Sequence, residues 1–421
     1  MRKIPIIAKI LGSLLCVTIL SGCWDQKETE ELAYVTVVGL DKDEENENMV
    51  KVTYVIANPE VGSLAEGGGG GGEPPLETIS FSASDFITSR SLANTVISKE
   101  ITYDVLRNIM VSEDFARDKD FIRWMYDITK EMEIRRDINL FVTKEDPSAF
   151  VQNNQPKMDT GPHKYYELIF NRGQDTGTIP PSEVGQFFRI TEADADLFLG
   201  IYGTTEKSDN YKRDRDPDQF MAGELNYEGQ TNTTQFAGSA VFKEGKMIDT
   251  LTIEETRLSY LLSTTMKQPE ALLVALPDPF HEEYEVATKI YREKDIQINV
   301  NLKRDKPSIH ATVPIKMSIL TNHGMTNLAK YRDNREKLKK AFEETLNKEF
   351  EEFIKKTQEE YGSEPFGWSL AARKKFRTIP EFEEFDWMKT YPEMDVSIDT
   401  QIDLENFGRQ TDLPKMKEVR D

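Results

Sequence analysis

Cys23 is the residue whose type and setting most clearly predict chemistry, and it is one of only two cysteines in the chain, the other being Cys16. It directly follows Leu20-Ser21-Gly22, so two small residues precede the thiol. The thiolate is a strong nucleophile, and small residues on its N-terminal side give a peptidase room to approach. This setting predicts S-diacylglycerol attachment at Cys23, cleavage just before it and N-acylation of the new amino terminus. Cys16 would then be discarded.

The residues before Cys23 have the pattern of an export signal. Three basic residues precede an apolar run at 10–20. As a helix this run would span about 16 Å at ~1.5 Å per residue, well short of the ~30 Å hydrocarbon layer. The pattern predicts a cleaved lipoprotein signal peptide at 1–22 that ends in a lipobox. The alternative is that Cys23 is an ordinary small residue near the end of an uncleaved helix.

Composition limits the remaining classes of function. The chain has 421 residues, with 53 basic and 74 acidic side chains and a formal net charge of -21. Such a balance disfavours binding to a phosphate backbone, so we expect no nucleic-acid partner. Once Cys23 is alkylated no thiol is left to form a disulfide or a cysteine metal site.

The histidines and the glycine-rich stretch give no catalytic or cofactor motif. The histidines are scattered, without H-x-x-x-H spacing: His163, His281, His310 and His323. Six consecutive glycines at 67–72 are followed by Glu73-Pro74-Pro75, where a phosphate-binding loop would continue into a helix. We therefore expect a flexible loop at 63–75, no cofactor and no catalytic residue.

A run of alternating aspartates raises the possibility of calcium binding. Asp214, Asp216 and Asp218 are spaced as in an EF-hand loop, but Gln219 stands where that loop needs glycine and Leu225 where it needs glutamate. A solvated charged loop is the favoured interpretation, and no metal site is expected.

The elements after Cys23 alternate between strands and helices. A hairpin is expected over 30–57, then a helix near 84–97, a strand near 105–111, a helix capped by Ser112 and a strand at 137–144. Such alternation predicts a sheet covered by helices.

A second folded region begins at a hairpin over 238–251, followed by a helix with Thr252 and Glu255 in capping-box spacing. Strands are expected near 271–276, 284–291, 296–302, 309–320 and 394–402. A long helix near 326–361 has one apolar stripe and i,i+4 pairs such as Glu351 with Lys355. Trp368 and Trp387 are expected to be core or inter-element anchors. The fold class is therefore α+β and multidomain, with mixed sheets packed against helices.

The expected domain organisation has four parts after the signal peptide. They are an N-terminal α+β domain at 23–190, a charged linker at 191–236, a small middle domain of hairpin and helix at 237–280, and a C-terminal α+β domain at 281–421.

Three stretches together carry a resemblance to a known family. The first comprises Gly22, Cys23, Trp24, Asp25, Leu32, Ala33, Val35, Gly39 and Asp41. The second is G-S-A-V-F-K-E-G-K-M at 238–247 with the threonine-bearing helix after it, and the third comprises Phe366, Gly367, Trp387 and Gly408. In these the sequence resembles the C-subunit lipoproteins of bacterial spore germinant receptors, the Ger(x)C family. It departs from the family pattern at the glycine-rich loop and at Ser363-Glu364-Pro365, where an aspartate usually precedes the F-G element.

The resemblance implies three α+β domains without catalytic activity. It implies a lipoprotein anchored through Cys23 at the outer face of the inner spore membrane. Integral A and B subunits would be its partners in detecting nutrients and triggering germination. The resemblance leaves open which subunit binds the nutrient, and only Cys23 carries an expected role.

Two other classes compete with this interpretation. A solute-binding lipoprotein of a transporter would enclose its ligand in a cleft between two lobes. An envelope hydrolase would need a buried carboxylate pair or a histidine site at the bottom of a cleft.

Overall fold

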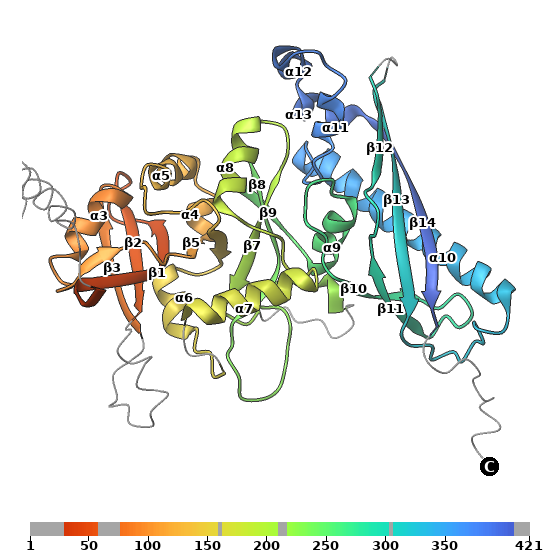
Figure 1. Cartoon of the computed structure of the whole chain (residues 1–421), viewed down its shortest axis with the longest axis horizontal. Coiled ribbons are helices and arrows are strands. Elements are labelled where there is room, and N and C mark those ends of the chain that lie inside the picture. Colours follow the sequence, from red (N-terminus) through yellow and green to blue (C-terminus); the bar gives the residue numbers. More distant parts are fainter. Residues whose placement is uncertain (1–28, 58–75, 159–161, 209–216, 303–305, 408–421) are drawn as a thin grey trace, which may run out of the picture.

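A computed structural model describes residues 29–57, 76–158, 162–208, 217–302 and 306–407. Within these residues the chain forms two sheets, both packed against helices, in one elongated body (Figure 1). The expected α+β, multidomain fold is confirmed.

The first sheet contains nine strands in the order β3-β2-β1-β5-β6-β7-β8-β9, with β4 beside the start of β1. Strands β1, β5, β6 and β7 are parallel, and antiparallel hairpin partners flank them on both sides. Their bounds are β1 (Leu32–Lys42), β2 (Val50–Ala57), β3 (Leu76–Ala83), β4 (Glu100–Thr102), β5 (Asn108–Ser112), β6 (Asn139–Thr143), β7 (Phe198–Thr204), β8 (Gln235–Lys243) and β9 (Lys246–Leu251).

Helices cover both faces of this sheet, which explains why its central strands are buried along their whole length. One face packs against α3 (Phe86–Ala93), α4 (Glu113–Ala116), α5 (Phe121–Ile128) and α8 (Val184–Ala193). The other packs against α6 (Pro147–Asn153) and α7 (Pro162–Asp175). The predicted N-cap is confirmed, since Ser112 Oγ accepts a hydrogen bond from the backbone N–H of Phe115.

The second sheet has the order β10-β11-β13-β12, and β14 pairs in parallel with β13 along most of its length. The bounds are β10 (Leu272–Pro277), β11 (Glu285–Tyr291), β12 (Gln297–Asn301), β13 (Ser308–Ile319) and β14 (Asp395–Asn406). Helix α10 (Arg332–Lys356) packs on β14, and its apolar stripe is buried as predicted. Asn347 and Glu343 on this helix also accept hydrogen bonds from the backbone N–H groups of Thr400 and Ile402.

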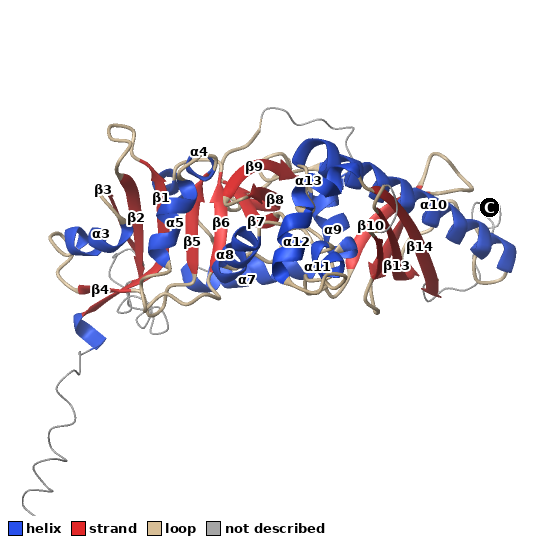
Figure 2. Ribbon diagram, turned by 90° about the horizontal axis from the view of Figure 1, so that it is seen from above, coloured by secondary structure: helices blue, strands red, loops and turns tan. Residues whose placement is uncertain are grey.

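Helix α9 (Ile253–Leu262) lies between the two sheets, as seen from above in Figure 2. Its predicted capping box between Thr252 and Glu255 is confirmed. The core that surrounds it includes Leu199 and Val241 of the first sheet together with Ile290 and Ile315 of the second. The two sheets therefore share one continuous apolar core.

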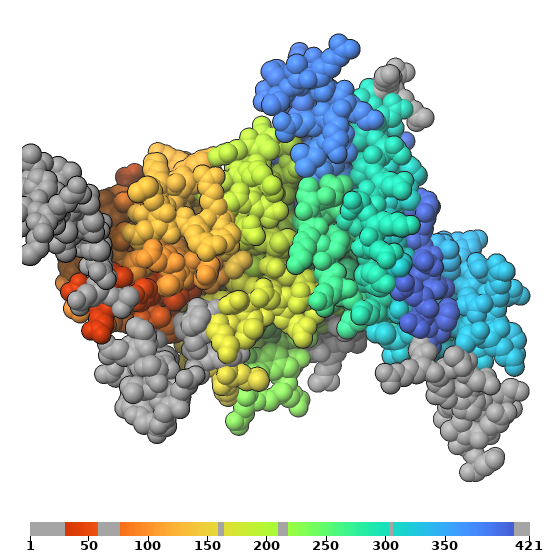
Figure 3. All heavy atoms as spheres, in the orientation of Figure 1, coloured from red at the N-terminus to blue at the C-terminus, as the bar shows by residue number. Residues whose placement is uncertain are grey.

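Short helices follow α10 before the chain enters β14. They are α11 (Ser369–Arg373), α12 (Ile379–Phe385), α13 (Trp387–Thr390) and the 3-10 turn Tyr391–Glu393. This segment stands out in blue at the top of the space-filling view (Figure 3). Trp368 and Trp387, at its base, are buried in the shared core, as predicted for anchors.

The domain boundaries expected from the sequence differ from the observed connections between elements in three places. The expected linker at 191–236 contains β7, a fully buried strand between β6 and β8. The expected middle domain at 237–280 contributes β8 and β9 to the first sheet and β10 to the second. The expected boundary at 280 falls between β10 and β11, which pair directly.

The long helix and its ion pairs also differ from expectation. Helix α10 begins at Arg332, after a turn in which Asn327 Oδ1 accepts from the Lys330 N–H, and it ends in a π-helical turn at Thr357–Tyr361. Its i,i+4 pairs run from a basic residue to the following glutamate, as in Lys355–Glu359 at 3.7 Å, instead of from Glu351 to Lys355. The glycine-rich loop at 63–75 and residues 1–28 lie outside the described residues.

Candidate functional site

Cys23, Trp24 and Asp25 lie outside the described residues, as does Gly408. Strand β1 begins nine residues after Cys23, at Leu32. The lipid attachment predicted for Cys23 therefore stays a prediction.

Gly39 and Asp41, at the end of β1, have clear structural roles. A side chain at Gly39 would place its Cβ 2.5 Å from Cβ of Pro147, so glycine allows α6 to pack on the strand. Asp41 accepts a hydrogen bond from Ser112 at the end of the parallel neighbour β5. Burial is the main cause that raises the pKa of Asp41 to about 6. The hydrogen bond between Asp41 and Ser112 therefore joins the carboxyl ends of the parallel strands β1 and β5.

A charged network continues along this carboxyl edge of the sheet. Lys51 Nζ lies 2.6 Å from Asp146 Oδ2, and Asp146 also caps α6 by accepting from the Ala149 N–H. Burial opposes ionisation of Asp146, but its hydrogen bonds with Lys51, the Ala149 N–H and Asp41, together with the Lys51 charge, hold its pKa below the ordinary value. Glu145 accepts from the backbone N–H of Thr205 at 2.6 Å. The carboxylates are thus largely occupied by partners within the fold.

An open groove of about 680 Å³ lies beside this edge, between the β1–β2 turn and helices α4 and α5. Charged side chains of both signs line it, and Lys42 forms an ion pair of 2.9 Å with Asp118 within it. A second hollow, of about 40 Å³, lies between α9, β10 and α10. It is far smaller than the roughly 300–1,000 Å³ of a typical ligand site.

The second stretch of the resemblance contacts the end of α10. Lys243 Nζ donates a 2.8 Å hydrogen bond to the backbone carbonyl of Tyr361, and the Tyr361 hydroxyl donates to Asp249 Oδ2 at 2.7 Å. Beside them, Lys356 Nζ lies 2.7 Å from Glu255 Oε1 of the capping box. The hairpin β8–β9 and helix α9 are therefore tied to the last turn of α10.

The third stretch packs against the end of α9. Gly367 adopts a φ of +75°, and a side chain there would meet Thr265 Cγ2 at 2.7 Å. The Thr264 N–H donates to the carbonyl of Phe366 at 2.7 Å, and Trp368 Nε1 donates to the carbonyl of Leu262 at 2.9 Å. We call the contact of residues 195–197, 243–265 and 361–369 the joint.

Glu364 organises the joint from its centre. This side chain has no exposed surface, and its carboxylate accepts hydrogen bonds from four successive backbone N–H groups. The four donors belong to Phe366, Gly367, Trp368 and Ser369. Its own carbonyl accepts from the Leu197 N–H at 3.0 Å. Glu364, where the sequence departs from the family pattern, thus holds the F-G-W turn against the first sheet.

Asp196 lies next to Glu364 within the joint. As a residue it is partly exposed, but its Oδ1 is buried and has no hydrogen-bond partner among the described residues. Burial raises the pKa of Asp196 to about 6, and burial together with the Asp196 charge raises that of Glu364 well above its ordinary value. The hydrolase alternative calls for such a pair at the bottom of a cleft. Here four backbone N–H groups enclose the Glu364 carboxylate.

Three of the four histidines, His281, His310 and His323, have side chains that the structure describes. Among the residues that the structure describes, no group of three or more His, Cys, Asp or Glu side chains could hold a metal ion. The Tyr284 ring lies 6.3 Å from the His281 ring and 6.3 Å from the His323 ring. His310 Nδ1 lies 3.0 Å from Ser397 Oγ. Nothing is described of the His163 side chain.

The aspartate run considered for calcium, and favoured as a solvated charged loop, lies mostly outside the described residues, which omit positions 214 and 216. Its third aspartate, Asp218, forms an ion pair with the largely buried Arg257 of α9. None of the helices in the described ranges is both long and apolar enough to cross a lipid bilayer.

Two family models match the chain. "Spore germination protein N-terminal domain" matches residues 25–203, and "Spore germination B3/ GerAC like, C-terminal" matches 237–408. The first match includes Gly39 and Asp41, and the second includes the joint residues Lys243 and Glu364.

Curated relatives and a solved structure agree with these matches. The chain is 22% identical to "Putative spore germination protein YfkR" of Bacillus subtilis (strain 168) over 95% of its own length and 96% of the relative's. It is also 22% identical to "Spore germination protein B3" of the same organism, over 92% and 95%. "Crystal Structure of the GerBC protein" matches with a TM-score of 0.50 and 16% identity, over 87% of this chain and 96% of that one. The solved structure supports the fold, and the two models together identify the chain as a member of the Ger(x)C family of spore germination proteins.

Proposed function

We propose that this protein is the lipid-anchored C subunit of a spore germinant receptor. It would be held at the outer face of the inner spore membrane by S-diacylglycerol and an N-acyl group on Cys23. It would act without enzymatic activity, together with integral A and B subunits, in triggering germination when nutrients are sensed.

The position of Cys23 relative to the family match is the observation that carries this proposal. The N-terminal match begins at residue 25, two residues after Cys23, and nothing before the lipobox belongs to it. The matched sequence thus begins within two residues of the cysteine, which supports a mature form that starts at Cys23. The coarser assignment, a member of a spore germination family, is established above.

Tethering gives the mechanism its physical basis. A lipid anchor confines the folded body to a layer near its membrane partners, where effective concentrations reach about the millimolar range. Weak interfaces then suffice for assembly. A body with a net charge of -21 for the whole chain would otherwise be repelled by an anionic membrane.

The non-enzymatic role is supported by how the acidic groups are used. Asp146 caps a helix and pairs with Lys51, while Glu364 holds four backbone N–H groups. Groups committed to such contacts are unsuited to act as a general acid or base.

Intact-mass analysis of the protein from the native host tests the anchor. We expect a chain that starts at Cys23 and carries diacylglycerol and one further acyl group, recovered in the membrane fraction. Cys23→Ser is expected to move the protein to the soluble fraction. Cys16→Ser is the matched control and is expected to change neither mass nor location. An unmodified Cys23, or retention of the Cys23→Ser protein on the membrane, would contradict the proposal.

A further inference from the structure

Two loops at the amino edge of the first sheet form an exposed rim. The first, residues 103–107, leads from β4 into β5, and the second, residues 130–137, leads from α5 to β6. They lie side by side, because the Asn139 N–H donates to the carbonyl of Arg107 at 2.8 Å and the Tyr103 N–H donates to Glu133 Oε2 at 2.9 Å. We call these residues the rim.

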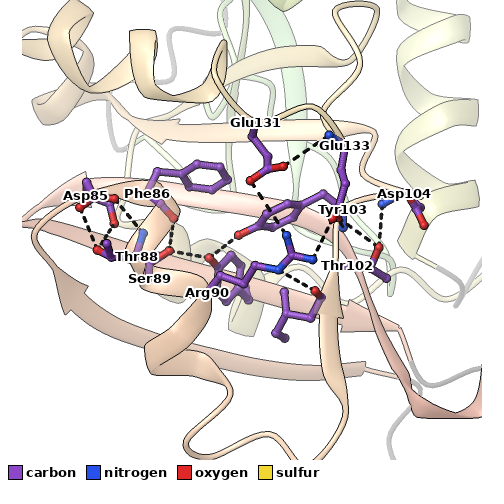
Figure 4. Close-up of polar contacts among 12 residues, drawn as sticks. Asp85, Phe86, Thr88, Ser89, Arg90, Thr102, Tyr103, Asp104, Glu131 and Glu133 are labelled. Carbon is purple, nitrogen blue, oxygen red and sulfur yellow. Dashed lines mark hydrogen bonds and ion pairs between the residues drawn. The ribbon is translucent and has the colours of Figure 1, made fainter. Parts of the chain in front are cut away.

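The rim is braced from below by Arg90 of α3 (Figure 4). Its guanidinium donates to Glu133 Oε1 at 2.9 Å and to the carbonyl of Ile101 at 2.8 Å, lies 4.0 Å from Glu131 and sits over the Tyr103 ring. The hydroxyl of Tyr103 in turn contacts that of Tyr54 in the core at 2.7 Å. The two loops are thus a fixed surface, and their two glutamates are paired inward with Arg90.

The outward side of the rim has an unusual composition for this protein. Met132 is 98% exposed and Val105 is 37% exposed. The rim, residues 103–107 and 130–137, contains four basic and four acidic residues, in a chain where acids outnumber bases by 74 to 53. Arg107 and Arg136 are exposed on the two loops. The surface combines protruding apolar side chains with a neutral charge balance.

The chain leaves the fold on this same side. Strand β4 pairs with the first residues of β1, Leu32 opposite Glu100, and the 3-10 turn Thr29–Glu31 precedes them. Thr29 lies six positions after Cys23, a reach of about 20 Å when fully extended at ~3.4 Å per residue. An acyl chain at Cys23 therefore holds this edge, and not the opposite one, near the lipid.

We propose that the rim docks on the anionic lipid surface, with Met132 and Val105 at the level of the headgroups and the arginines facing lipid phosphates. Exposed apolar side chains flanked by arginine are suited to such an interface. The docking rests on the anchor proposed for Cys23, and it adds an orientation: the parallel strands of the first sheet point away from the membrane, with the charged groove on the far side.

Fluorescence quenching at single introduced cysteines tests the orientation. With Cys23 lipidated and Cys16 removed, Met132→Cys provides one reactive thiol. Met158→Cys is the matched control, since Met158 is 96% exposed. It lies at the opposite edge, where Lys157 Nζ donates to the carbonyl of Gln230 just before β8. The full lipidated chain would be dye-labelled and placed on vesicles of phosphatidylglycerol and phosphatidylethanolamine.

We expect a nitroxide-bearing lipid to quench the dye at 132 several-fold more strongly than the dye at 158, and aqueous iodide to show the reverse order. Equal quenching at both positions on vesicle-bound protein would overturn the docking alone. Protection from iodide at 132 without quenching by the nitroxide lipid would mean that another protein surface covers the rim, and would also overturn it. Protein that fails to bind vesicles and carries no acyl groups by mass would overturn both the anchor and the docking.

Discussion

Asp196 and Glu364 place two carboxyl groups next to each other at the point where the two sheets meet. They lie 168 positions apart in the chain. The residues just before them are also in contact, because the Ser363 hydroxyl donates a hydrogen bond to the Ala195 carbonyl. Glu364 uses its oxygens to hold the F-G-W turn, while one oxygen of Asp196 is buried without a partner. Like-charged neighbours of this kind make the joint sensitive to substitution and to pH.

Glu364→Gln is expected to destabilise the protein strongly. The amide would present an NH₂ group to two of the four backbone N–H donors, and each buried donor left without an acceptor costs about 1–3 kcal/mol. Unfolding in guanidinium chloride should show that the free energy of unfolding falls by several kcal/mol. Asp196→Asn is the matched control, because it removes the neighbouring charge and adds a donor toward Glu364, so it should cost little. A larger loss for Asp196→Asn than for Glu364→Gln would show that the roles are assigned the wrong way round.

Stability should depend on pH through Asp196. Burial raises its folded pKa from 3.8 to about 6, so between these values the folded state binds more protons than the unfolded state. The free energy of unfolding contributed by this group is therefore greatest below about pH 4 and falls as pH rises toward about 6. The difference between wild type and Asp196→Asn reports this contribution together with the effect of the Asp196 charge on Glu364. A difference that stays constant over this range, or that grows in favour of wild type with rising pH, would refute it.

Gly39→Ala should destabilise the first sheet. The added methyl group would collide with Pro147 at 2.5 Å and force α6 away from β1. Overpacking of this kind typically costs about 1–3 kcal/mol. A double-mutant cycle with Pro147→Gly, which removes the opposing Cβ, should recover part of that loss. Strictly additive losses would show that the two sites do not interact.

Lys243→Met should weaken the tie between the β8–β9 hairpin and α10. It removes a charge-assisted hydrogen bond to the Tyr361 carbonyl, at a cost of about 1–2 kcal/mol. Lys246→Met, on the same turn but exposed, is the control and should stay within about 0.5 kcal/mol of wild type. Equal effects in thermal unfolding would indicate a general effect of charge in place of the specific contact.

Local signals in the sequence were sufficient for individual elements. The hairpin of β1 and β2, the Ser112 cap and the Thr252–Glu255 capping box depend on residues close together in the chain, and all three are confirmed. Strand β7 was missed because its short apolar run is followed by a long polar stretch, and only pairing on both sides makes it a strand.

The joint could not be predicted from the sequence. Its members come from 195–197, 243–265 and 361–369, and no local pattern indicates that they meet. Lys356, for example, looks like an i,i+4 partner of Glu352 but bonds Glu255, because the end of α10 lies against the capping box of α9. The resemblance did select residues on both sides of this contact, Lys243 and Gly367 among them.

The most direct test of the central claim is nutrient-triggered germination of spores whose only copy of this protein carries Cys23→Ala. With folded protein present at the normal level, we predict that nutrients no longer trigger the release of dipicolinate through this receptor, while the Cys16→Ala control germinates normally. Unchanged germination of the Cys23→Ala spores would contradict the account of this chain as a lipid-anchored receptor subunit.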